Sequence, residues 1–147
     1  MKQEVWKAFK RVALSENKGP DRSGSAAQQD RILSALIIDS PWVPGFVGIS
    51  HLDYFTLPEQ WMRANLYVED RFPDIIFLPG FWVEYGMATE PSAFGCKITW
   101  RKESPPSIHP TLRDISDASQ LKVPNPAEDG LMPLVLNLYR HLEKNLR

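Results

Sequence analysis

Residues 74–78 read Asp-Ile-Ile-Phe-Leu, a run whose last four residues are all apolar and which stops at Pro79-Gly80. A strand with one face in water alternates apolar and polar residues. Successive apolar residues are typical of a parallel strand that is covered on both faces. Parallel strands are joined by a crossover segment, usually a helix. The run therefore favours an α/β fold.

The residues before this strand supply the rest of a βαβ unit. Residues 32–38 (ILSALII) could continue a helix from Ala26, but a β-branched pair runs straight into Asp39-Ser40-Pro41. A residue before proline avoids the helical region, so we favour a short buried strand that ends at residues 39–40. Residues 42–55 are apolar and aromatic without a steady period. They are predicted to form an irregular loop over a cavity or an interface.

A helix is predicted from the capping pattern Thr56-Leu57-Pro58-Glu59 to about Arg71, with Thr56 as its N-cap. Beyond the second strand, the sequence predicts a short helix at 91–94, a strand at 96–100, irregular chain at 103–110, a helical turn at 116–121 and a long helix at 131–146. The order strand, helix, strand, excursion, helix indicates a right-handed βαβ unit.

The N-terminal residues differ from the rest. Residues 1–16 are predicted to be an amphipathic surface helix. Residues 17–31 are polar and rich in Gly, Ser and Ala, which indicates a linker or an insertion, and residues 32–147 form the main unit. The start has no apolar core of signal-peptide length, and the longest apolar run, 35–38, cannot span a bilayer. We therefore expect a cytoplasmic protein.

Charge and cysteine content exclude several classes of function. The formal net charge is -1, with Lys and Arg scattered along the chain, so nothing indicates binding to nucleic acid or to an anionic membrane. The single cysteine, Cys96, excludes an internal disulfide framework and a Cys-rich zinc site. The three histidines are far apart and lack metal-ligand spacing.

Three stretches carry a family resemblance: DSPWVPG-x-x-GISHLDYFTLPEQW, RFPDIIFLPGFWVEYGMATEPSAFGCKITW, and PPSIHPTLRDISDASQLKVPNPAEDGLMP. In their order and spacing they resemble the N-terminal half of the uroporphyrinogen decarboxylase superfamily, over residues 35–147. The resemblance implies the N-terminal part of a (β/α)8 TIM-type barrel that is incomplete, since such a barrel typically takes about 250 residues. Open strand edges would then require a C-terminal barrel half or self-association.

The superfamily has two branches. Its true decarboxylases bind tetrapyrrole carboxylates through a motif of the form RQAGRYLP and an aspartate after the second strand, and this sequence has neither. The aromatic loops of this chain are more similar to the other branch, the cobalamin-dependent methyltransferases, which move methyl groups between small donors and a corrinoid protein and use zinc. The zinc ligands of that branch lie in the C-terminal half. We accordingly expect no metal or cofactor bound by this chain alone, a corrinoid protein as a candidate partner, and no activity without the C-terminal half.

Barrel enzymes place their chemistry at the carboxyl ends of the strands, which here are Asp39-Ser40 and residues 79–84. Asp39 could act as a base or bind substrate, or it could cap the following loop. Glu84 could be a half-buried acid–base group with a raised pKa, or it could be solvated or paired with arginine. Predicted substrate-binding residues are Trp42, Phe46, His51, Tyr54, Phe81 and Trp82. The aromatic residues among them could line a pocket for a planar or apolar ligand, or pack in a core or an interface.

Two other functions stay open from the sequence. One is a tetrapyrrole-binding protein similar to uroporphyrinogen decarboxylase. The other is a non-enzymatic truncated domain that self-associates.

Overall fold

The computed structural model describes residues 34–78 and 80–145. The predicted N-terminal helix and linker, residues 1–31, lie outside this range. Strand β1 (Ser34–Ile37) pairs in parallel with β2 (Ile75–Leu78), with Ser34 opposite Ile75. Helix α4 (Pro58–Arg71) lies between them in sequence. The predicted α/β fold with a parallel βαβ unit is therefore confirmed.

The prediction of an irregular loop over residues 42–55 is wrong. Two short helices occupy this stretch, α2 (Trp42–Val47) and α3 (His51–Thr56). Gly48 ends α2 with a left-handed φ of 77°. Ser50 begins α3, and its hydroxyl accepts a hydrogen bond from the Asp53 amide at 3.0 Å. The aromatic and apolar residues here are helical because these two caps stop and restart the helix.

The predicted N-cap of α4 is also wrong. Thr56 is the last residue of α3, and its hydroxyl donates to the Leu52 carbonyl at 2.6 Å. Leu57 stands at the N-cap of α4 without a side-chain cap, and Pro58 opens the helix. Pro58 fits this position because its missing N–H would have no partner in the first turn. The predicted end near Arg71 is confirmed.

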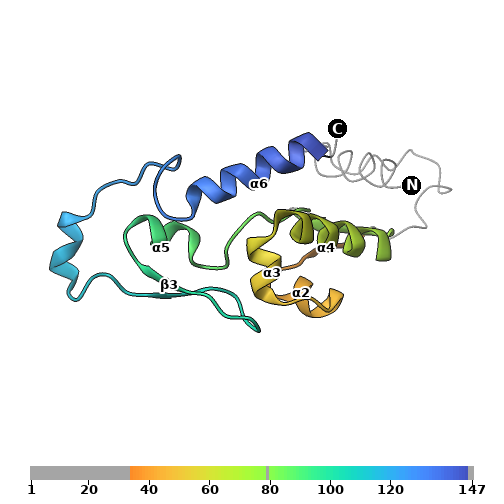
Figure 1. Cartoon of the computed structure of the whole chain (residues 1–147), viewed down its shortest axis with the longest axis horizontal. Helices are drawn as coiled ribbons and strands as arrows, with labels where there is room; N and C mark the ends of the chain where they lie inside the picture. The colour runs from red at the N-terminus through yellow and green to blue at the C-terminus, as the bar shows by residue number, and fades with distance from the viewer. Residues whose placement is uncertain (1–33, 79, 146–147) are drawn as a thin grey trace, which may run out of the picture.

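The excursion after β2 contains helix α5 (Thr89–Ala93), strands β3 (Lys97–Thr99) and β4 (Ser107–His109), and a 3-10 turn at Ile115–Gln120. The two strands pair antiparallel, so the prediction of irregular chain over 103–110 is wrong at 107–109. Pairing with β3 imposes this regular structure on a proline-rich segment. Helix α6 (Met132–Asn145) follows, and Figure 1 shows it along one long side of an elongated molecule, with the β3 hairpin on the opposite side.

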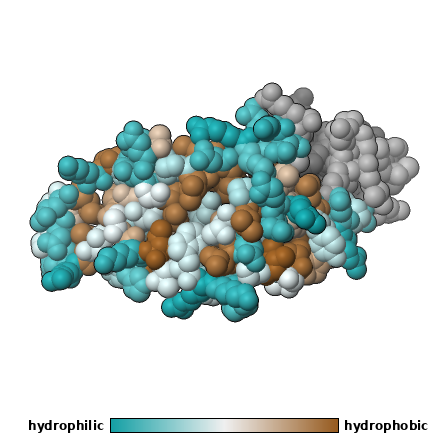
Figure 2. Space-filling model, viewed as in Figure 1, coloured by the Kyte–Doolittle hydropathy of each residue, from teal (hydrophilic) through white to brown (hydrophobic). Residues whose placement is uncertain are grey.

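The hydrophobic core lies between α4, β2 and the loop after β2. Trp61, Val68, Phe77, Val83 and Ala88 are buried there. Figure 2 shows apolar residues interspersed with polar ones on one face of the molecule. Within the described range, no helix combines the length and apolar character needed to cross a membrane.

Strand β1 is exposed, contrary to its prediction as a buried strand. All four of its residues are exposed, and Ile37 keeps 72% of its surface in solvent. Among the described strands, β1 pairs with β2 alone, which leaves its other edge unpaired. Burial depends on such tertiary neighbours, and the local sequence does not encode them.

Helices α5 and α6 meet at Gly130. The Leu131 amide donates to the Ser92 hydroxyl at 2.8 Å, and this hydroxyl donates to the Thr89 carbonyl at 2.6 Å. Gly130 has a φ of 57°, and a Cβ on it would collide with Ser92 and the Ala93 backbone nitrogen. This close approach requires glycine at the position.

Candidate functional site

The carboxyl ends of the two parallel strands meet through one hydrogen bond. Asp39 and Ser40 follow β1, and Glu84 follows β2 after a short loop. The Ser40 hydroxyl, which is 1% exposed, donates to Oε1 of Glu84 at 2.6 Å. The predicted pair Asp39 and Glu84 is therefore brought together at the edge where barrel enzymes hold their reacting groups.

The environment of Glu84 favours its protonated form. Burial raises the pKa of its carboxyl above the ordinary value, and a hydrogen bond with the Asp39 carboxyl and the Asp39 charge raise it further. The hydrogen bond from Ser40 acts in the opposite direction. A half-buried carboxyl that keeps its proton can serve as a general acid. The alternative of a Glu84 paired with arginine gains no support, because its partners are Ser40 and Asp39.

Tyr54 is a buried residue whose hydroxyl is influenced by the charges of both carboxyl groups. It is 1% exposed, and its hydroxyl accepts a 3.0 Å hydrogen bond from Nδ2 of Asn65. Burial raises the pKa of Tyr54 to about 12, and the negative charges of Glu84 and Asp39 add to this effect. Tyr54 was predicted to bind substrate in an aromatic pocket. The structure places it in the core, where its hydroxyl is bonded to Asn65.

His51 anchors the loop that follows Ser40. Its Nε2 donates to the Pro41 carbonyl at 3.1 Å, and its backbone amide donates to the Lys102 carbonyl at 2.9 Å. The ring also lies near Phe55, at a centroid distance of 6.5 Å. These contacts tie His51 to the residue after Ser40 and to Lys102.

The predicted aromatic residues Trp42, Phe46 and Phe81 fall into two separate groups of ring contacts. Trp42 stacks on Phe46 at 4.6 Å, and Phe46 also approaches Phe72 at 5.6 Å. Phe81 instead packs on Trp61 of α4 at 5.8 Å, and Trp82 is half-buried in the same loop. Trp42 and Phe46 thus belong to one aromatic surface, and Phe81 belongs to another.

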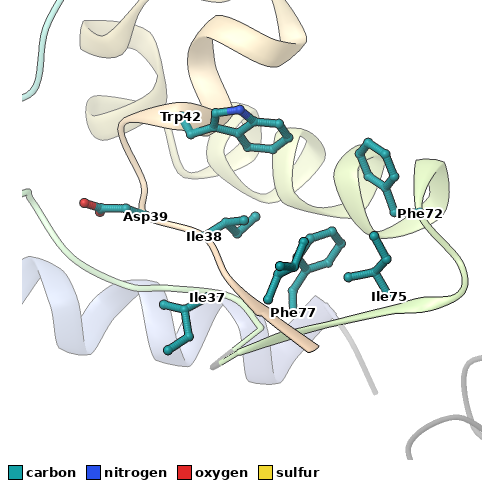
Figure 3. Close-up of a pocket in the computed structure, with 8 residues that line it drawn as sticks. Ile37, Ile38, Asp39, Trp42, Phe72, Ile75 and Phe77 are labelled. Carbon is teal, nitrogen blue, oxygen red and sulfur yellow. The ribbon is translucent and has the colours of Figure 1, made fainter. Parts of the chain in front are cut away.

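Trp42 also lines an apolar pocket of about 410 Å³ beside β1. Figure 3 shows the rings of Trp42 and Phe72 facing Ile38, Ile75 and Phe77 across it. The carboxylate of Asp39 points away from this space. The pocket therefore offers an apolar surface that borders the strand end at Asp39, and Glu84 is not among its lining residues.

Sequence reasoning missed Ser40 and Asn65. Asn65 is 5% exposed, and it occupies the same buried face of α4 as Trp61 and Val68. A polar residue on an otherwise apolar helical face was the available signal, because such a side chain must find a partner. Ser40 gave no comparable signal beyond its place at the end of a strand.

The described residues do not fit a zinc ion. Across 34–78 and 80–145, no group of three or more His, Cys, Asp or Glu side chains is placed to hold a metal. His51 already bonds the Pro41 carbonyl, and His109 bonds the Thr99 hydroxyl at 2.8 Å.

The family model described as uroporphyrinogen decarboxylase (URO-D) matches residues 46–147, which is more than half of the chain. No curated protein and no solved structure matches.

Proposed function

This chain belongs to the uroporphyrinogen decarboxylase family, and we propose that it is a barrel portion of the cobalamin-dependent methyltransferase type. It binds a small, apolar methyl donor beside Glu84, and the methyl group passes to a corrinoid protein. The observation that carries this proposal is the 2.6 Å hydrogen bond from the Ser40 hydroxyl to Glu84 at the strand ends, where burial and Asp39 raise the pKa of the Glu84 carboxyl.

The carboxyl pair suits the leaving group of such a donor. When a methyl group leaves an oxygen or a sulfur for an external acceptor, the C–O or C–S bond breaks and the acceptor's electron pair forms the new bond to carbon. The oxygen or sulfur keeps the old electron pair and needs a proton. Glu84 can donate that proton, and general acids of this kind typically contribute about 10²–10⁴-fold to rate. Glu84 must then regain a proton from solvent, and the Asp39 carboxylate beside it is a second group that can accept that proton.

The charge of the site supports a neutral donor over a tetrapyrrole. Uroporphyrinogen-type substrates carry many carboxylates, which require cationic partners. Residues 39–50 and 80–86 contain no Arg or Lys, and the polar groups at the site are Asp39, Ser40, Glu84 and Tyr54. The apolar pocket at Trp42 fits an uncharged methyl ether, alcohol or thiol. These features argue against the tetrapyrrole-binding alternative.

Further barrel strands are proposed to complete the site. Strand β1 exposes its apolar residues and has an unpaired edge within the described sheet. A C-terminal barrel half, or a second copy of this chain, would cover that edge. Turnover is expected only in such an assembly. The same exposed edge favours the second candidate function, a self-associating domain without catalysis.

Titration with anisole, a neutral aryl methyl ether, tests the proposed donor site. Anisole is expected to shift the Trp42 indole N–H signal in NMR spectra. Its affinity should fall by about 3- to 10-fold as the pH rises through the pKa of Glu84, because only the protonated carboxyl donates to the ether oxygen. Glu84→Gln should remove the pH dependence, and Glu90→Gln, at an exposed position on α5, should retain it.

A coproporphyrin titration separates the two branches. The methyltransferase proposal expects no saturable binding of coproporphyrin. Saturable porphyrin binding together with no response to anisole would overturn it. If neither ligand binds while the chain forms a discrete oligomer, the non-enzymatic candidate gains the support.

A further inference from the structure

A second cavity of about 410 Å³ lies between the end of α3, helix α6 and the end of β3. Its walls include Phe55, Tyr85, Trp100, Leu134, Leu138 and His141. Asp39, Ser40 and Glu84 are not among its lining residues. The cavity is therefore separate from the site proposed for the methyl donor.

Aromatic rings form one wall of this cavity. Tyr85 meets Trp100 edge to face, with centroids 6.0 Å apart and planes at 86°. The ring of Phe55 also lies near Tyr85, with a distance of 6.1 Å between the ring centroids. Edges and faces of rings arranged in this way favour another aromatic ring as their neighbour. Leu134 and Leu138 of α6 add apolar surface opposite.

One polar atom in the cavity wall lacks a partner. Nε2 of His141 is buried and makes no hydrogen bond. The other two histidines do bond through Nε2, His51 to the Pro41 carbonyl and His109 to the Thr99 hydroxyl. A buried polar atom normally has a hydrogen-bond partner, because burying such an atom without a hydrogen bond lowers the stability of the folded chain. A ligand in the cavity would supply the missing partner.

We propose that this cavity binds a neutral, single-ring aromatic molecule with one hydroxyl group, a phenol, whose hydroxyl bonds Nε2 of His141. The size of the cavity falls within the range of about 300–1,000 Å³ common for small-molecule sites. No Lys, Arg, Asp or Glu lines it, so a charged ligand would find no counterion. A hydroxyl both donates and accepts, and so it can satisfy either tautomer of the imidazole.

Binding of phenol and of toluene tests the proposal, because toluene carries a methyl group where phenol carries the hydroxyl group. Calorimetry should show saturable phenol binding about 3- to 10-fold tighter than toluene binding, as expected for one added hydrogen bond. NMR should show phenol shifting the imidazole ¹⁵N signals of His141. In His141→Phe the preference for phenol should disappear while the weaker binding of toluene remains.

Two control variants keep this result distinct from the proposed methyl-donor site. His109→Phe changes an exposed histidine on β4 and should leave the phenol preference unchanged. Trp42→Ala should weaken anisole binding at the first pocket and leave the His141 response to phenol intact. Absence of saturable phenol binding, or a phenol preference that persists in His141→Phe, would overturn the inference. Thermal melts of each variant identify any that fail to fold.

Discussion

The Ser40 hydroxyl donates a 2.6 Å hydrogen bond to Oε1 of Glu84, and this contact links the loop after β1 to the loop after β2 across 44 positions of sequence. Both residues stand where parallel strands end at the same edge. The bond therefore assembles the candidate site and constrains the βαβ unit at once. Glu84 stays half-buried because Ser40 and Asp39 hold it there.

Glu84→Gln is expected to flatten the dependence of stability on pH. Below the ordinary glutamate pKa of 4.5, the carboxyl is protonated in both the folded and the unfolded chain. Its burial then carries no ionisation penalty, and the folded chain has its full stability. As the pH rises through the raised pKa of the folded state, ionisation is less favourable in the folded chain, and the free energy of unfolding falls. Urea unfolding from pH 4 upward, at about half-unit steps, measures this fall.

The matched control for that prediction is Glu90→Gln, which changes the same residue type at an exposed position. It should keep the wild-type pH profile. Parallel profiles for wild type and Glu84→Gln would show that burial and Asp39 do not perturb Glu84 in solution.

Much of this site follows from the order of elements in the sequence. The apolar run at 75–78 locates β2, and a parallel partner for it places Asp39 and Glu84 at one edge. Their proximity was predictable for that reason. Asn65 was not predicted, since its partner Tyr54 comes from a different helix, and the pairing depends on how α3 packs on α4.

The errors in the predicted fold have a similar origin. Helices α2 and α3 have six residues each, which is less than two turns and too short for a periodic pattern. Ser50 and Asp53 carried the cap signal that could have located α3. The strand at 107–109 exists because β3 pairs with it, and a proline-rich stretch gives no local sign of such pairing.

Tyr54→Phe is expected to lower the free energy of unfolding by about 1–3 kcal/mol, because Nδ2 of Asn65 loses a buried acceptor. Ultraviolet titration provides a second measurement. The variant should lack the tyrosine ionisation that is expected for Tyr54 near pH 12 in the wild type. Because the pKa of Tyr54 is raised in the folded chain, wild-type stability also falls as the pH rises from 10 to 12.

Tyr139→Phe serves as the control, since Tyr139 on α6 is 53% exposed. A surface change of this kind usually alters stability by less than about 0.5 kcal/mol. Equal losses in the two variants would contradict the assignment of a buried hydrogen bond to Tyr54.

Gly130→Ala is expected to destabilise the chain by about 2–5 kcal/mol. The left-handed backbone alone costs about 1–2 kcal/mol for a residue with a Cβ. The added Cβ also collides with Ser92 and the backbone of Ala93. Helix α5 cannot shift to relieve this collision without breaking the hydrogen bond from the Leu131 amide to the Ser92 hydroxyl. Denaturant midpoints measure the loss.

Gly45→Ala makes the same chemical change inside α2, where a Cβ meets nothing within 4 Å. It should stabilise the chain by about 0.5–1 kcal/mol, since alanine is the better helix former. A loss at Gly130 no larger than the change at Gly45 would remove the argument for close packing of α5 on residue 130.

Ile37→Lys is expected to weaken self-association. Ile37 is 72% exposed on β1 and lines the apolar pocket beside Trp42, so a second copy that pairs with this edge would bury it. A lysine there places a charge in the interface and blocks edge pairing. Sedimentation velocity over a concentration series should show a dissociation constant raised by about 10-fold or more.

Val123→Lys adds the same charge at a loop residue that is 95% exposed, and it should leave association unchanged. Equal weakening by both variants would indicate a general effect of charge, and a wild-type chain that stays monomeric at every concentration would contradict self-association through β1.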